Sequence, residues 1–247
     1  KMSLFYELDP PSEDAEPQLP PLLKSEVVKD GQDPFSKAIV AATAGDIGTV
    51  FYSPKNDFLN FAVTLGPEIE REKALQVHYV MMLGCSDALG ALAPPEIDIS
   101  HLWPNLIFLN RGLMGKILLM DPGGEKNKIP SWLVSGVQMR LKVETKFLDE
   151  RLEGTSLEDE GGSYLSRIRL IEAISRHFLV WLNTWQEEGF KPIHQKWMER
   201  VEKKISLPNL PDGSQQEWIG LDENGLAIFK KDEKHNIFSL EKANISK

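Results

Sequence analysis

Apolar and polar positions first form a regular pattern from residue 33 onward. Asp33 followed by proline is typical of a helix start, and we expect this helix to run to Thr43. Residues 48–53 are rich in β-branched and aromatic side chains, and residues 59–65 place an apolar side chain at every second position. Only the turn-forming residues 54–57 lie between these two strands, so we expect a tight hairpin.

Longer apolar stretches predict three further helices. Residues 68–91 begin with acidic side chains, which suit a helix N-terminus, and continue as a mostly apolar segment, so we expect one long buried helix. From Tyr164 to Trp185 apolar residues recur at helical spacing, and Gly189 should end that helix. A shorter helix should follow over residues 192–201, where apolar residues are spaced by four.

Short strands should lie between and after these helices. We expect strands at 97–99, 106–110, 113–120 and 132–143, and three short ones over 217–240, broken at 222–225 and 232–236. Because short links join consecutive strands, the main sheet should be mixed and largely antiparallel. The pattern therefore predicts an α+β fold in which helices flank the sheet, followed by a small C-terminal β module.

Composition changes along the chain divide it into three parts. Residues 1–30 are rich in proline and acidic residues, which disfavour regular helix, so we expect an extended arm. Residues 31–207 should form the core domain, and a charged, glycine-containing loop should span residues 148–162 within it. A linker with prolines and glycine at 208–213 should lead to a small β domain over residues 214–247.

Charge and cysteine content limit the classes of function. Acidic residues outnumber basic ones by 37 to 28, the formal net charge is -9, and no long Lys/Arg run occurs, so we expect no nucleic-acid partner. No apolar run approaches the ~20 residues that cross a bilayer, and we expect no membrane partner and no signal peptide. Cys85 is the only cysteine, which fits a reducing, cytoplasmic location.

Three motifs give the chain a family resemblance. Residues 102–105 read Leu-Trp-Pro-Asn, and residues 112–118 follow as a Gly-x-x-Gly-x-Ile-Leu stretch. Gly189-Phe190 and the Gly-Leu-Asp-x-x-Gly-Leu segment at 220–226 come later in the chain. In this order the motifs resemble those of the biotin/lipoate A/B protein ligase family, in a divergent bacterial branch with a small C-terminal domain. The resemblance implies a biotin/lipoate ligase-like core and an SH3-like β module at the end.

The resemblance also implies a reaction and the residues that carry it. Such ligases activate biotin, lipoate or octanoate with ATP and pass the acyl group to a lysine of a biotinyl or lipoyl carrier domain. In the family an arginine-rich glycine loop, a pocket lysine and an aspartate support this chemistry. Here residues 54–57 fill the place of the loop, no arginine lies between Lys37 and Arg71, and Gly112 and Leu106 replace the lysine and the aspartate. Losing one such group costs ~2.7–4 kcal/mol of transition-state stabilisation, so ATP-dependent ligation is in doubt.

Four residues are candidates for the missing chemistry, each with a structural alternative. Lys116 and Arg111 are the remaining cations near the lysine position, although exposed hairpin charges often have no role. His101 could act as a base or bind an anion, or be a surface residue or a capped one. Cys85 could accept an acyl group, but its apolar helix favours a buried structural thiol.

Trp103, Asn105, Gly112 and Gly115 are the candidate lining of a ligand pocket, or else form a structural turn and strand. No histidine or cysteine pattern has metal-ligand spacing, so we expect no metal site. Two functions stay open: acyl or biotinyl transfer by a divergent ligase, and carboxylate-ligand or carrier-domain binding without catalysis. A homodimer is a further expectation, since many ligases of this class pair through the sheet.

Overall fold

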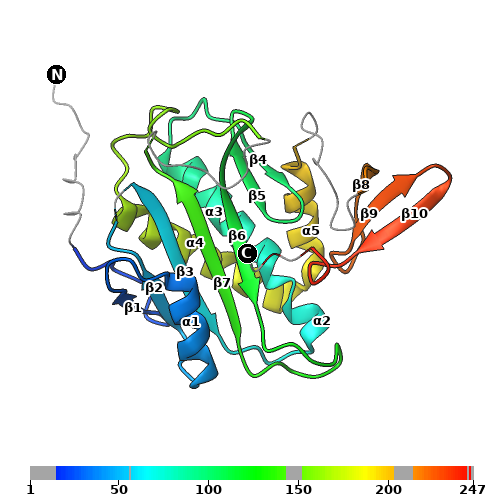
Figure 1. Ribbon diagram of the computed structural model, residues 1–247, viewed down its shortest axis with the longest axis horizontal. Coiled ribbons are helices and arrows are strands. Elements are labelled where there is room, and N and C mark those ends of the chain that lie inside the picture. Colours follow the sequence, from blue (N-terminus) through cyan, green and yellow to red (C-terminus); the bar gives the residue numbers. More distant parts are fainter. Residues whose placement is uncertain (1–14, 56, 143–151, 203–213, 244, 246–247) are drawn as a thin grey trace.

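A seven-stranded mixed sheet forms the centre of the protein (Figure 1). The structure is a computed structural model that describes residues 15–55, 57–142, 152–202, 214–243 and 245. The strand order is β1-β2-β3-β7-β6-β5-β4, and only β1 and β2 pair in parallel, which confirms the predicted mixed, largely antiparallel sheet. The strands are β1 (Lys24–Val27), β2 (Thr49–Tyr52), β3 (Phe58–Leu65), β4 (Ile99–Leu102), β5 (Leu106–Leu109), β6 (Gly112–Met120) and β7 (Leu133–Arg140).

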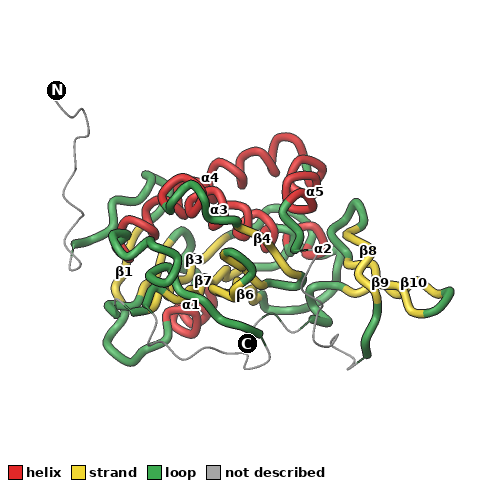
Figure 2. The backbone as a smooth tube through the Cα atoms, turned by 90° about the horizontal axis from the view of Figure 1, so that it is seen from above, coloured by secondary structure: helices red, strands yellow, loops and turns green. Residues whose placement is uncertain are grey.

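Helices cover both faces of this sheet. Helix α1 (Pro34–Thr43) lies on one face, and α3 (Val77–Leu92), α4 (Arg167–Glu188) and α5 (Phe190–Glu199) lie on the other (Figure 2). The fold is therefore α+β, as the sequence predicts. The strand predicted at 97–99 is displaced: β4 begins at Ile99 and runs to Leu102, because the chain pairs with β5 only from Ile99 onward.

The N-terminus of α1 follows directly from its sequence. Asp33 caps the helix: one carboxylate oxygen accepts a hydrogen bond from the Ser36 backbone N–H at 2.9 Å, and proline fills the first helical position. The apolar side of α1 packs on the sheet through Phe35. Gly136 of β7 allows this close contact, because a Cβ there would lie 2.6 Å from the Phe35 ring.

The opposite face of the sheet holds the larger apolar core. Leu59, Phe61 and Val63 are almost fully buried under α3 and α4, which confirms the alternation predicted for this strand. The two helices pack closely because a Cβ at Gly84 would lie 2.9 Å from the backbone of Phe178. The predicted β2–β3 hairpin is also confirmed, with Val50 opposite Val63.

The prediction of a single helix over residues 68–91 was wrong. Helix α2 (Arg71–Ala74) comes first, and α3 starts after a short break. Across the break, Gln76 and His78 donate backbone hydrogen bonds to residues three positions earlier, as in a tighter 3₁₀ turn. The first N–H groups of α2 bond to carbonyls of the β6–β7 loop, at Lys126 and Lys128, so a distant loop decides where this helix begins.

The last two helices differ slightly from their predicted bounds. Ser166 caps α4, and Gly189 ends it with a positive φ of 77°, which glycine adopts without the strain of a Cβ, so the helix ends where the sequence predicts. Helix α5 starts at Phe190 rather than at Pro192. Proline fits there because the first turn of a helix needs no internal N–H partner.

A three-stranded antiparallel sheet follows the core, built from β8 (Glu217–Leu221), β9 (Ala227–Lys231) and β10 (Lys234–Phe238). The three predicted β runs are confirmed, but the break between β9 and β10, predicted over residues 232–236, is only two residues long. The predicted linker at 208–213, residues 1–14 of the predicted arm and residues 148–151 of the charged loop lie outside the described residues. Residues 24–27 of that arm form strand β1.

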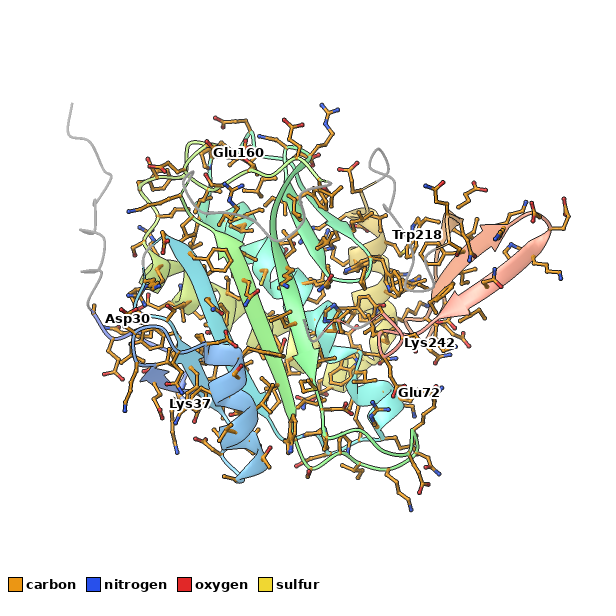
Figure 3. All side chains as sticks on the ribbon, in the orientation of Figure 1. Asp30, Lys37, Glu72, Glu160, Trp218 and Lys242 are labelled. Atoms are coloured by element: carbon orange, nitrogen blue, oxygen red, sulfur yellow. The ribbon has the colours of Figure 1, made fainter. Side chains whose placement is uncertain are left out.

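Aromatic rings join this small sheet to the core. Trp218 of β8 lies at the junction (Figure 3) and packs against Trp103 and Trp197, with ring centroids 6.4 and 6.2 Å away. The turn after β8 docks as well, because the Tyr79 hydroxyl donates a 2.6 Å hydrogen bond to the Gly225 carbonyl. Throughout the described part of the chain, no helix is both long and apolar enough to span a bilayer.

Candidate functional site

Three polar side chains form a row across the sheet on the face that carries α1. In the strand register Asn60 lies opposite Gln138, and Gln138 lies opposite Lys116. Two residues further along each strand, the same face is apolar and covered by α1. This polar row, Asn60–Gln138–Lys116, therefore lies next to the N-terminus of the helix.

The N-cap residue of α1 joins the polar row. The Asn60 side-chain amide donates to one Asp33 carboxylate oxygen at 3.3 Å, while the other oxygen accepts from the Ser36 hydroxyl at 2.8 Å. The Asn60 side-chain oxygen is buried and has no hydrogen-bond partner among the described residues. A buried acceptor without a partner is costly, so a ligand N–H or O–H group that bonded to this oxygen would remove that cost.

Lys116 provides a cation in a partly desolvated position. Burial lowers the pKa of Lys116, and the negative charge of Asp33 acts against that effect. An ammonium that has lost part of its water gains more from an anionic ligand than one on an open surface. Lys116 is thus the sequence candidate that the structure places in a polar cluster.

Two of the predicted pocket residues hold β6, the strand that carries Lys116, in place. Asn105 is buried at the β4–β5 turn and exchanges two 2.9 Å hydrogen bonds with the backbone of Ile117, the residue next to Lys116. A Cβ at Gly115 would collide with the Gln138 carbonyl oxygen, so this glycine allows β6 and β7 to approach. Both residues hold the strand that presents the lysine.

The other predicted pocket residues lie elsewhere. Trp103 is 1% exposed, and its ring packs against Phe229 of the small sheet at 5.5 Å. Gly112 lies against the described part of the charged loop, where an added Cβ would lie 2.6 Å from Thr155.

Arg111, an exposed residue with φ 70°, occupies the β5–β6 turn. Lys116 is five positions further along the chain, about 16 Å along β6, so the structure does not bring these two cations together.

His101 and Cys85 are enclosed in the helix-covered core. His101 is fully buried, its Nε2 lies 2.5 Å from the Ser86 hydroxyl, and its ring stacks on Trp197. Burial and then the charge of Arg200 lower the pKa of His101 to about 3, so the ring is neutral. Burial also raises the pKa of the Cys85 thiol, which fits the structural alternative for this residue.

An arginine from a distant helix reaches the β2–β3 connection, which the resemblance aligns with the arginine-rich loop of the family. Arg167 of α4 donates a 2.8 Å hydrogen bond to the Ser53 carbonyl and lies 5.4 Å from the centre of the Tyr52 ring. No local signal could predict this, because 114 positions separate Arg167 from Ser53. Asn60 and Gln138 were missed for a related reason, since a polar residue on an alternating strand indicates only a solvent-facing side. Among the described residues no group of three or more His, Cys, Asp or Glu side chains comes together to hold a metal ion.

The fold is that of an α+β protein with a polar row on one face of its sheet, and sequence comparison gives its family. Residues 19–199 match the model of the biotin/lipoate A/B protein ligase family, and the chain belongs to that family. The biotin--[acetyl-CoA-carboxylase] ligase of Paracoccus denitrificans is 25% identical over 178 residues, which cover 69% of this chain and 74% of that protein.

Solved structures agree with this membership. A biotin protein ligase-like protein of unknown function from Silicibacter sp. TM1040 superposes with a TM-score of 0.83 and 29% identity, over 90% of this chain and 96% of its own. The biotin protein ligase of Aquifex aeolicus gives a TM-score of 0.66 at 21% identity, over 87% and 93% of the two chains, and shows the shared fold alone. The family resemblance predicted from the motifs is therefore confirmed.

Proposed function

We propose that this protein binds a carboxylic acid of the biotin or lipoate type at the polar row and takes part in its transfer to a lysine of a carrier domain. Membership of the ligase family supports the class of ligand, and the name of the Paracoccus relative supports biotin and a carboxylase-borne acceptor. The observation that carries the proposal is one row that holds the half-buried Lys116 on β6 and, two strands away across Gln138, an Asn60 oxygen that has no partner among the described residues.

The ligand's two kinds of polar group match the row. Its carboxylate, or the acyl group's oxygen, would bind to the Lys116 ammonium. A ligand N–H or O–H group would donate to the buried Asn60 oxygen, and the Gln138 amide can donate or accept beside it. The apolar part of such an acid would extend along the sheet toward Leu106, which lies opposite Lys116 in β5.

The second candidate function is ligand or carrier-domain binding without activation of the acid. It is favoured by the short connection between β2 and β3, where the Ser53 N–H bonds back to the Asn60 carbonyl at 2.9 Å. This connection has no arginine of its own, and Arg167 bonds to its backbone. Stabilisation of an acyl-adenylate would then need groups from elsewhere. The SH3-like character of the small module, a homodimer and a cytoplasmic location stay predictions.

Calorimetric titration with biotin, lipoate and octanoate tests the proposed ligand site. We expect one of these acids to bind, and Lys116→Met to weaken binding by about 10- to 100-fold, because a charge-assisted hydrogen bond contributes ~1.5–3 kcal/mol. Lys242→Met, which changes an exposed lysine of the C-terminal module, should leave the affinity unchanged.

Equal affinities of the wild type and the Lys116→Met variant would place the ligand elsewhere and refute the site. Mass spectrometry after incubation with ATP and the bound acid then separates the two functions. Acyl-adenylate formation supports the ligase, and its absence with intact binding supports the non-catalytic protein.

A further inference from the structure

A groove of about 860 Å³ lies where the helical side of the core meets the C-terminal module. It is lined by the connection from β3 to α2, the residues from α2 to the start of α3, Leu133 of β7, the end of α4 with the start of α5, and the turn at Glu223–Asn224. These helices cover the sheet face opposite the polar row. The groove is therefore distinct from the proposed carboxylate site.

Large apolar side chains form much of the groove. They include Ile69, which is 39% exposed, and the partly buried Leu182 and Trp185. The volume is within the roughly 300–1,000 Å³ typical of ligand sites, and such sites often lie between domains. Exposed apolar surface of this kind inside a concave region indicates binding of an apolar group.

The charged residues of the groove are mainly acidic. Glu68, Glu187 and Glu223 line it together with a single lysine, Lys73, and all four side chains are exposed. The groove therefore combines an apolar lining with an excess of negative charge. A ligand that complements it carries apolar groups and positive charge.

Hydrogen bonds across the groove fix its two sides relative to each other. The Gln76 side chain donates to the Asn224 carbonyl at 3.0 Å and accepts from the Trp185 indole N–H at 3.0 Å. One side chain thus connects α3, α4 and the C-terminal module. A groove with walls held in this way loses little conformational entropy when a ligand binds.

We propose that this groove binds an extended segment of a partner protein in which large apolar side chains alternate with lysine or arginine. The groove is open to solvent, so a small molecule would stay partly exposed to water there, whereas a peptide segment can place its side chains into the groove from the surface. Because the segment would contact both the core and the turn at Glu223–Asn224, its binding also stabilises the docked C-terminal module.

Fluorescence anisotropy with labelled peptides and the full-length protein tests this proposal. The probe is a short fluorescein-labelled peptide in which leucine and phenylalanine alternate with lysine, and the matched probe carries glutamate in place of lysine. We expect the lysine peptide to bind at least about tenfold more tightly than the glutamate peptide, and its binding to weaken as salt is added.

Protein variants locate the binding to the groove. Reversing two groove charges in the double variant Glu68→Lys, Glu187→Lys should lower the affinity for the lysine peptide by about tenfold, and Ile69→Ser should lower this affinity as well. The control Glu96→Lys changes an exposed charge beyond the far end of α3, and Val180→Ser changes an exposed apolar residue of α4 outside the groove lining. Both controls should bind like the wild type. Tighter binding of the glutamate peptide, no binding of either peptide, or equal effects of groove and control variants would each overturn the proposal.

Discussion

The docking of the C-terminal module on the core can be tested at a single glycine. Gly225 has a φ of 86°, and a Cβ there would lie 2.9 Å from the Tyr79 ring and 3.1 Å from the Phe190 ring. Both rings are buried and cannot move away freely. Replacing Gly225 with alanine therefore adds backbone strain and a steric clash at the same position.

The two costs have different sizes and can be separated. A left-handed backbone costs a residue with a Cβ roughly 1–2 kcal/mol, and overpacking a buried contact costs roughly 1–3 kcal/mol. Gly45 has a φ of 90° with no atom within 4 Å of an added Cβ, so Gly45→Ala adds the backbone strain without a steric clash. We expect Gly225→Ala to lose ~1–3 kcal/mol more free energy of unfolding than Gly45→Ala.

Urea unfolding followed by tryptophan fluorescence measures this difference, because Trp218 and Trp103 report on the junction. Hydrogen exchange of β8–β10 shows whether the loss is local to the module, as expected. Equal losses for the two alanine variants would mean that the turn does not rely on close contact with the core, and would refute the docking argument.

Two further predictions concern charged residues. Burial lowers the pKa of Lys116 in the folded protein, so the charged form of Lys116 destabilises the fold at neutral pH. Lys116→Met should therefore raise the melting temperature. This gain should shrink as pH rises from the lowered pKa toward the usual value of 10.5, because the lysine then becomes neutral in the folded protein. A variant that melts below the wild type at neutral pH would contradict this. Arg71→Met should cost ~3–5 kcal/mol in chemical denaturation, because it leaves the Asp121 carboxylate buried without its cation. Lys126→Met removes an exposed ion pair and should cost only ~0–1 kcal/mol, and similar losses for the two variants would be evidence against a buried anchor.

Local physical chemistry determines much of the secondary structure from the sequence alone. Asp33 followed by proline begins α1 as predicted, because the cap and the ring's fixed φ act within a few residues. Alternation over residues 59–65 assigned a buried face to β3, and Gly189 ended α4. The motifs at 102–105 and 112–118, which lie within the matched residues, also pointed to the family without a structure.

Tertiary structure decided the rest, because it depends on groups that local patterns cannot relate. The polar row takes Asn60, Lys116 and Gln138 from three strands, and only strand order and register bring them together. The start of α2 depends on carbonyls of the β6–β7 loop, and Arg167 reaches Ser53 from another layer of the fold. The periodicity of a segment gives its own buried face, but which distant atoms meet that face is set by how the whole chain packs.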